Sequence, residues 1–74
     1  MAEDPTMFRA WRRTWPDEEP PLDDWIVGGG LDYCRVYLHA GGRWYWCAVR
    51  EVSIGSGLEE TREEAMAAAK AAWA

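Results

Sequence analysis

The chain has 74 residues and a formal net charge of −5, with 13 acidic residues against eight lysines and arginines. A chain this short forms one domain, which we take as residues 1–74, and it buries only about 60% of the surface that its unfolded form exposes. Its two cysteines form no CxxC pair and it has one histidine, so the ligands are too few for zinc, and we expect neither a metal nor a cofactor. Charged and glycine residues interrupt every apolar stretch, which predicts a cytoplasmic protein with reduced thiols and no membrane contact.

Residues 1–24 combine a segment rich in arginine and tryptophan with an acidic loop. In the stretch MFRAWRRTW, Phe8, Trp11 and Trp15 have helical spacing, whereas every second residue from 7 to 15 alternates as in a strand, so both conformations stay open. The loop DEEPPLDD carries five carboxylates and two prolines. Such a loop is either a solvated connection or a negatively charged surface that a partner binds.

Residues 25–54 predict an antiparallel β-meander of about three strands. The stretch DDWIV supplies the first strand, and Gly28–Gly30 then form a hairpin turn rather than a phosphate loop, since the GxGxxG spacing is missing. The next two strands form a hairpin around Gly41 and Gly42.

The length of that second turn decides which side chains share a face. A two-residue turn pairs His39 with Trp44 and Val36 with Cys47, and this is the register that we favour. It leaves an apolar face for a helix and, opposite to it, an aromatic and basic face. The aromatic and basic face contains Arg35, Tyr37, Trp44, Trp46 and Arg50. A three-residue turn exchanges the two faces of the second strand and places its tryptophans inside.

A helix is predicted over residues 61–73, after a connector at residues 55–60 whose two glycines are free to adopt positive φ. Thr61 and Glu64 fit a capping box, so the helix itself begins at Arg62. At about 100° per residue, one side of the helix gathers small and apolar residues that pack on the sheet. These residues are Ala65, Met66, Ala68, Ala69, Ala72 and Trp73. The predicted class is therefore α+β, a meander with a C-terminal helix packed on one face.

Candidate catalytic groups do not converge in this sequence. His39 with Asp32 or Glu51 has the composition of an acid–base pair, and Cys34 or Cys47 that of a nucleophile. A chain of this size has little room to enclose a substrate, so a strand histidine and core thiols are the better interpretation. We expect no enzymatic activity.

The aromatic and basic face has the composition of a stacking platform for single-stranded nucleic acid, on which each base contributes roughly 1–3 kcal/mol. In the alternative, Phe8, Trp11 and Trp15 fold over this face and make it a second core layer, because so many exposed tryptophans favour aggregation. Direct nucleic-acid binding is also disfavoured by the net charge of −5, since phosphate contacts need a positive surface.

The same negative charge suits a protein that occupies the nucleic-acid channel of another protein. Clustered carboxylates then stand in for phosphates in front of a basic groove. The candidate partner-binding residues are Asp17, Glu18, Glu19, Asp23, Asp24, Glu59, Glu60, Glu63 and Glu64.

Three stretches, WRRTWPDEEPPLDDWIVGGGLDYCRVYL, GGRWYWCAV and TREEAMAAAKAAW, carry a family resemblance. The chain resembles small uncharacterised proteins of bacterial genomes and prophages that share RTWP, GRWxW and TREEAM motifs in this order, although it has Cys34 where the group usually has glycine. The resemblance implies a meander-and-helix fold in a mobile-element setting, and it assigns no active site. By analogy in size, charge and setting, such proteins are similar to phage inhibitors of host defence, anti-CRISPR proteins included.

We therefore predict a non-enzymatic inhibitor that binds a host nucleic-acid-processing complex, such as a CRISPR effector, through an acidic surface that mimics DNA. One alternative is a module that binds single-stranded nucleic acid on the aromatic and basic face. Another is a structural protein that self-associates through its tryptophans.

Overall fold

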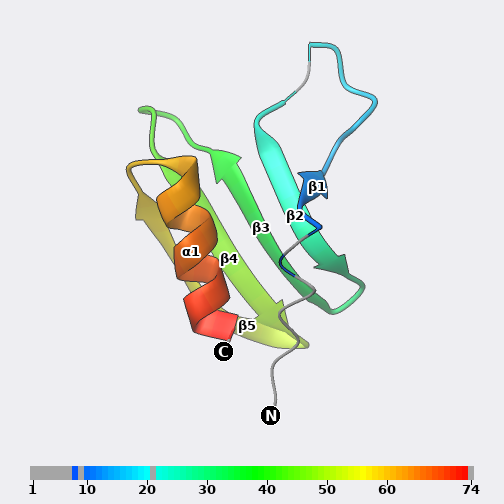
Figure 1. Cartoon of the computed structure of the whole chain (residues 1–74), viewed down its shortest axis with the longest axis vertical. Helices are drawn as coiled ribbons and strands as arrows, with labels where there is room; N and C mark the ends of the chain where they lie inside the picture. Colours follow the sequence, from blue (N-terminus) through cyan, green and yellow to red (C-terminus); the bar gives the residue numbers. More distant parts are fainter. Residues whose placement is uncertain (1–7, 9, 21, 74) are drawn as a thin grey trace.

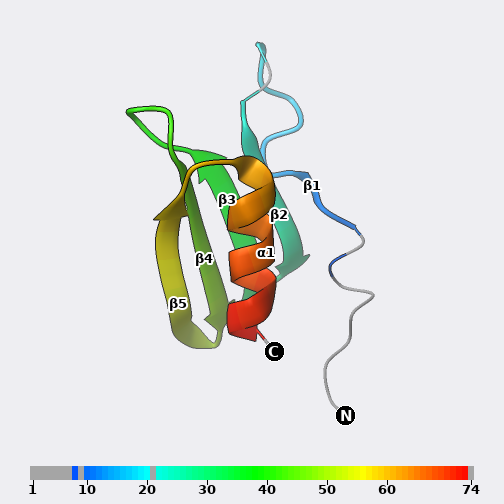
Figure 2. The ribbon, with the colours of Figure 1, turned by 60° about the vertical axis from the view of Figure 1, so that its left-hand side comes forward.

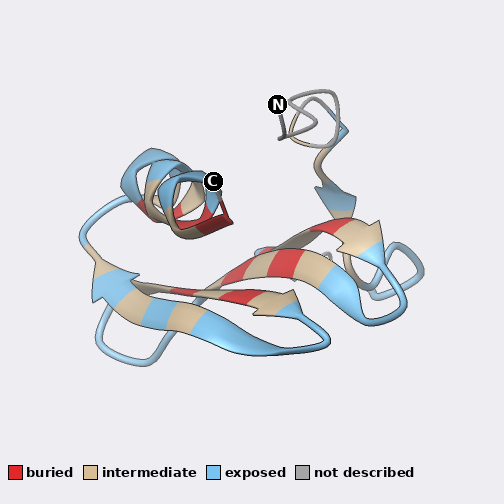
Figure 3. Ribbon diagram, turned by 90° about the horizontal axis from the view of Figure 1, so that it is seen from below, coloured by how far each residue is buried: buried red, intermediate tan, exposed pale blue. Residues whose placement is uncertain are grey.

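The structure is a computed structural model that describes residues 8, 10–20 and 22–73. Within these ranges, five strands form an antiparallel sheet in the order β1-β2-β3-β4-β5, and a C-terminal helix lies across one face of it (Figure 1, Figure 3). The elements are β1 (Arg12–Arg13), β2 (Asp24–Gly29), β3 (Asp32–Leu38), β4 (Trp44–Arg50), β5 (Val52–Glu59) and α1 (Arg62–Trp73). The α+β class and the C-terminal helix are confirmed, whereas the expected three strands are too few.

The N-terminal segment forms the short edge strand β1 rather than a helix or a long strand. Its two residues pair with Ile26 and Trp25 of β2. Ahead of β1, the Phe8 ring centroid lies 6.2 Å from that of Trp11 and 6.3 Å from that of Trp73 in the helix. The segment therefore packs against the core on the helix side of the sheet. Residues 7 and 9 of the expected alternation lie outside the described ones.

The favoured register of the β3–β4 hairpin is wrong, and the alternative register is correct. Leu38 pairs with Trp44, and Val36 pairs with Trp46. The turn closes with the His39 amide donating to the Arg43 carbonyl at 2.6 Å, which leaves three residues between them. This register turns Trp46 toward the helix, where it is 9% exposed, and so buries one of the two tryptophans of the strand.

The stretch expected to connect the sheet to the helix is mostly the strand β5. Gly55 and Gly57 lie within it and have no positive φ, so their expected role as turn residues is wrong. Their role is close approach: a Cβ added at Gly57 meets Nε1 of Trp46 at 2.9 Å, and one added at Gly55 meets the Cβ of Ala72 at 3.1 Å. The Trp46 indole therefore lies against bare backbone of β5, beneath the helix.

Helix α1 begins and packs as the sequence predicts. The Thr61 hydroxyl accepts a hydrogen bond from the Glu64 amide at 3.1 Å, which caps the helix in front of Arg62. The helix contacts β3, β4 and β5 (Figure 2). The buried apolar residues are Val27, Cys34, Val36, Trp46, Ala48, Ala65, Ala69 and Trp73, with Met66, Ala68 and Ala72 partly buried beside them.

The contact between Trp46 and β5 gives a first prediction. Replacing Gly57 by alanine should lower the free energy of unfolding by about 1–3 kcal/mol, because the added methyl overlaps the indole in a packed layer. Alanine in place of glycine otherwise favours the folded state by roughly 0.4–1 kcal/mol, so a loss cannot come from backbone entropy. Urea denaturation of Gly57→Ala and of the neighbouring exposed Ser56→Ala checks this. Equal stability of the two variants would contradict it.

Candidate functional site

The fold brings the two acidic parts of the chain to one end of the molecule. The strand pairs Asp24–Tyr37, Leu38–Trp44 and Trp44–Glu59 lie at this end. The loop before β2 and the connection from β5 to α1 both lie at this end, on opposite sides of it in the upper part of Figure 1. We call this region the acidic end. It comprises Asp17, Glu18, Glu19, Asp23, Glu59, Glu60, Glu63 and Glu64.

Most carboxylates of the acidic end face solvent. Seven of the eight are on exposed residues, and Glu59, which is half-buried, accepts a hydrogen bond from Nε1 of Trp46 at 3.2 Å. Glu60 lies 3.8 Å from Arg43 and Glu63 lies 3.2 Å from Arg62, in exposed pairs that contribute little to stability. Among the described residues, this end carries eight carboxylates but only three arginines, at positions 13, 43 and 62. The electrostatic potential at this end is therefore negative.

Asp24 was expected to belong to this surface, but the structure places it inside. Its side chain receives two hydrogen bonds from Arg35, at 2.9 Å and 2.6 Å, and one from Nε1 of Trp15 at 3.2 Å. The residue is 6% exposed. Asp24 is therefore satisfied within the chain, where it fixes β2 to β3 and holds the acidic loop through Trp15.

The surroundings of Asp24 shift its titration downward. Burial raises the pKa of its carboxyl, but the hydrogen bonds from Arg35 and Trp15 and the charge of Arg35 lower it by more, so the pKa lies below its ordinary value of 3.8. Asp24 thus stays ionised in the folded protein at a pH where it takes up a proton in the unfolded chain.

The five residues of the expected aromatic and basic face do not share one surface. Arg35 and Tyr37 lie on the face away from the helix, whereas Trp44, Trp46 and Arg50 lie on the helix side. The guanidinium of Arg50 stacks 4.2 Å from the Trp73 ring centroid and donates to the Trp73 carbonyl at 2.9 Å, so it caps the end of α1. The predicted stacking platform is therefore divided between two sides of the sheet.

The side of the sheet away from the helix carries a surface that the favoured register did not predict. No described helix or strand covers it (Figure 3), but at one margin the Trp15 ring centroid lies 6.0 Å from the Arg35 guanidinium. The rings of Tyr37 and Tyr45 lie 5.1 Å apart across β3 and β4, and the Arg35 guanidinium lies 4.9 Å from the Tyr37 ring. We call this surface the tyrosine face. It comprises Tyr33, Arg35, Tyr37, Tyr45, Cys47 and Val49, all half-buried. The sequence predicts this face when the alternation of side chains along β3 is combined with a three-residue turn between β3 and β4.

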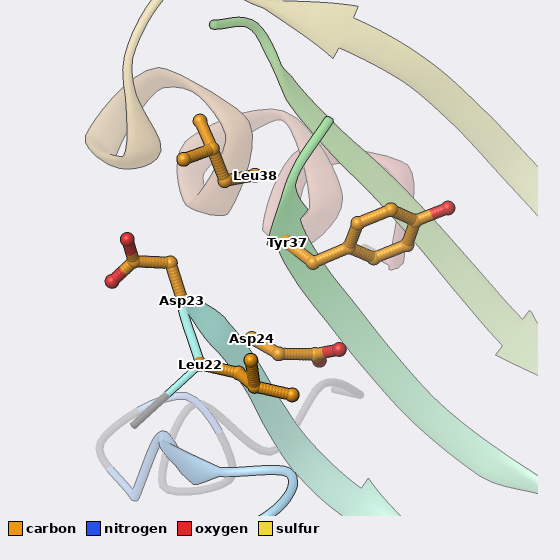
Figure 4. A pocket seen from close by; sticks show the side chains of 5 residues that line it. All are labelled: Leu22, Asp23, Asp24, Tyr37 and Leu38. Carbon is orange, nitrogen blue, oxygen red and sulfur yellow. The ribbon is translucent and has the colours of Figure 1, made fainter. Parts of the chain in front are cut away.

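The tyrosine face and the acidic end meet at a shallow hollow of about 360 Å³. Its lining residues are Leu22, Asp23, Asp24, Tyr37 and Leu38 (Figure 4). In Figure 4 the carboxylate of Asp23 points away from that of Asp24, while Asp24 and Tyr37 extend to the same side. The hollow thus combines a free carboxylate, exposed leucines and an aromatic ring, a combination suited to contact with another protein.

The candidate catalytic groups are not assembled. His39 lies in the exposed β3–β4 turn, while Asp32 and Glu51 lie at the opposite end of the strands. Burial raises the pKa of Cys34 to about 11 and also raises that of Cys47, so neither thiol is an activated nucleophile. Among the described residues, no group of histidine, cysteine and carboxylate side chains is arranged to hold a metal ion, and no helix is long and apolar enough to cross a membrane.

The Asp24–Arg35 pair gives a prediction on stability and pH. Replacing Asp24 by asparagine should lower the free energy of unfolding at pH 7 by about 1–3 kcal/mol, since charged hydrogen bonds to a half-buried arginine are lost. Because the folded pKa is depressed, the contribution of Asp24 is present above about pH 4 and disappears as the pH falls through the folded pKa. Urea denaturation at pH 7 and pH 3 of the wild type, Asp24→Asn and the exposed control Asp32→Asn measures this. A difference that is the same at both pH values would rule out the assigned role.

Comparisons of the chain with protein-family models, with curated proteins and with solved structures find no match. The resemblance to prophage proteins therefore stays a prediction from the sequence motifs.

Proposed function

We propose that this protein is a non-enzymatic inhibitor of the phage or prophage type that docks its acidic end onto the basic surface of a host nucleic-acid-processing complex. A CRISPR effector in the bacterial cytoplasm is a partner of this kind. The observation that carries the proposal is topological. Two acidic segments, separated by more than thirty residues in sequence, lie at one end of the sheet with most of their carboxylates exposed.

The charge of the acidic end favours a basic partner over nucleic acid itself. Exposed carboxylates gathered at one end of a molecule repel phosphates and attract the lysines and arginines that line a nucleic-acid channel. Such charges act mainly on the association rate and on specificity, and their effect weakens with salt. The partner contact set is the acidic end, without Asp24.

The anchoring of the acidic loop also supports this role. Trp15 ties the start of the loop to Asp24, and the guanidinium of Arg13 donates to the Leu22 carbonyl at 2.7 Å near its end. Pro16 and Pro20 restrict the backbone in between. A loop restrained at both ends loses less entropy when it binds than a free loop of the same length.

A pair of matched variants tests the proposal. Asp17→Asn with Glu18→Gln removes two charges from the acidic end, and Asp32→Asn with Glu51→Gln removes the same two residue types from the far end of the sheet. The tagged wild-type protein is used to capture complexes from nuclease-treated bacterial lysate, and each variant is then titrated against the captured complex. Two exposed charges of roughly 0.2–1 kcal/mol each should weaken binding about two- to thirtyfold for the first variant, with little change for the second.

Competition and salt distinguish this mechanism from unspecific capture. Duplex DNA should displace the protein from its partner, and the salt dependence of binding should be smaller for the acidic-end variant than for the wild type. Equal affinities of the two double variants, or a complex that DNA does not displace, would contradict docking through the acidic end.

A second candidate function is supported by the tyrosine face. Two tyrosines with an arginine beside them on an uncovered sheet have the composition of a surface on which single-stranded nucleic acid stacks. Arg35 is paired with Asp24, however, so its charge is largely compensated. The candidate therefore depends on stacking more than on phosphate contacts.

A labelled oligothymidine tests this second candidate. If the tyrosine face binds it, fluorescence anisotropy should rise with protein concentration at low salt, and Tyr37→Leu should weaken binding by about five- to 150-fold, as expected for the loss of one stacked base. Tyr33→Leu, nearer the far end of the strand, serves as the comparison within the same face. A flat titration of the wild-type protein would remove the candidate.

A further inference from the structure

The two edges of the sheet differ in how open they are. At one edge, β1 has two residues, whereas at the other edge β5 has eight. Within the described part of the chain, β5 is bonded to β4 on one side and has no neighbouring strand on the other. Its outer backbone groups are therefore free to pair with another strand.

Edge strands of soluble proteins usually carry features that prevent such pairing, and β5 has few of them. From Val52 to Leu58 it contains no charged residue and no proline. Three of its apolar side chains are exposed, with exposed fractions of 68% for Val52, 39% for Ile54 and 45% for Leu58. A bulge at Ile54, between Gly55 and Ser53, makes the pairing of the first residues of β5 with β4 irregular. The ladder from Gly55 to Glu59 is regular.

The sequence of β5 is nearly symmetric about Ser56. In the stretch IGSGL, residues 54–58, a glycine stands on each side of the serine and a large aliphatic residue stands beyond each glycine. In an antiparallel pair of two identical strands with the two-fold axis at Ser56, each residue lies opposite its mirror position. The near-symmetry then places serine opposite serine, glycine opposite glycine and a large aliphatic residue opposite another, and this match of size and polarity favours a second copy of the strand as the partner.

We infer that β5 pairs antiparallel with β5 of a second copy of this chain, with the two-fold axis at Ser56. Ser56 then lies opposite Ser56 of the second copy, Gly55 lies opposite Gly57, and Ile54 lies opposite Leu58. Glu59 and Glu60 lie opposite the uncharged residues 53 and 52, so no carboxylates face each other directly across the pair. The two sheets become continuous, both helices lie on one side, and both tyrosine faces lie on the other.

The pairing is weak and reversible. One strand pair buries less than the roughly 1,200 Å² that stable interfaces need, so the dissociation constant is expected between about 10 µM and 1 mM. The dimer does not depend on the proposed inhibitor function. Its test measures mass and crosslinking of the purified protein, so failure of either proposal is seen separately.

The first experiment is sedimentation equilibrium of the full chain from about 10 µM to about 1 mM. The average mass of the wild-type protein should rise from 8.5 kDa towards twice that value. Ser56→Lys places two like charges opposite each other on the two-fold axis and should raise the dissociation constant at least tenfold. Ala67→Lys, which adds the same charge on the exposed side of the helix, should leave it unchanged.

The second experiment tests the register by crosslinking. Residues opposite each other in antiparallel strands have Cα atoms about 4.5–5.5 Å apart, within the range of a disulfide. In this register Ser53 lies six positions, or roughly 20 Å, from its equivalent in the second copy. Under mild oxidation Ser56→Cys should therefore form a disulfide-linked dimer through the introduced thiols, and Ser53→Cys should not. Cys47 lies opposite position 56 in β4, so both variants are made together with Cys47→Ser, which prevents a disulfide within one chain. The Cys47→Ser protein gives the background from Cys34.

Three results would overturn the inference. These are a mass that stays at 8.5 kDa up to about 1 mM, a dimer that Ser56→Lys leaves intact, and crosslinking of Ser53→Cys as fast as that of Ser56→Cys. The second result would point to the tyrosine face as the contact surface, and the third to another register. Circular dichroism of each variant confirms that it is folded before the comparison is made.

Discussion

The packing of Trp46 between β5 and α1 is the contact on which the other features of the fold depend. Its indole lies against Gly55 and Gly57, and the helix lies over it with Ala72 close to β5. A side chain at either glycine would hold the indole and the helix away from the sheet. Because a short chain buries only a modest share of its surface, losing a tryptophan from the core would remove a large part of what stabilises it.

The position of Trp46 also decides what the protein presents to its surroundings. Alternation along β4 requires that Tyr45 and Cys47 point away from the helix once Trp46 points toward it. The tyrosine face is thus a consequence of the core. The Asp24–Arg35 pair then stabilises this outer face, because it spans β2 and β3 beside Tyr37 and holds Trp15. The β3–β4 register therefore determines both the packing of the core and the residues of the candidate surfaces.

Local signals in the sequence were sufficient to predict the helix but not the strand pairing of the sheet. Thr61, Glu64 and the alanine run specify the helix from neighbouring residues alone, and its start and buried side are as predicted. The β3–β4 register depends on a turn whose glycines allow two lengths. It is decided by Trp46 fitting against β5, a strand that its serines and glycines made hard to recognise.

For the acidic residues too, the number is known from the sequence, whereas their positions in the fold are not. Their abundance is read directly from the sequence, but nothing near Asp24 distinguishes it from Asp23 until β2 and β3 are paired. Pairing places Asp24 opposite Tyr37 and within reach of Arg35, and Asp23 stays outside the strand. The gathering of both acidic segments at one end also requires the whole strand order, since it depends on which ends of β2 and β5 lie together.

The distribution of charge makes the two proposed surfaces compatible with each other. An antiparallel β5 pair directs the acidic ends of the two copies in opposite directions, so their carboxylates are far apart compared with a Debye length of about 8 Å at physiological salt. A parallel pairing would bring them closer and would cost more electrostatic free energy. The negative charge therefore disfavours parallel pairing of β5 but not antiparallel pairing, so the proposed pair would leave both acidic ends exposed.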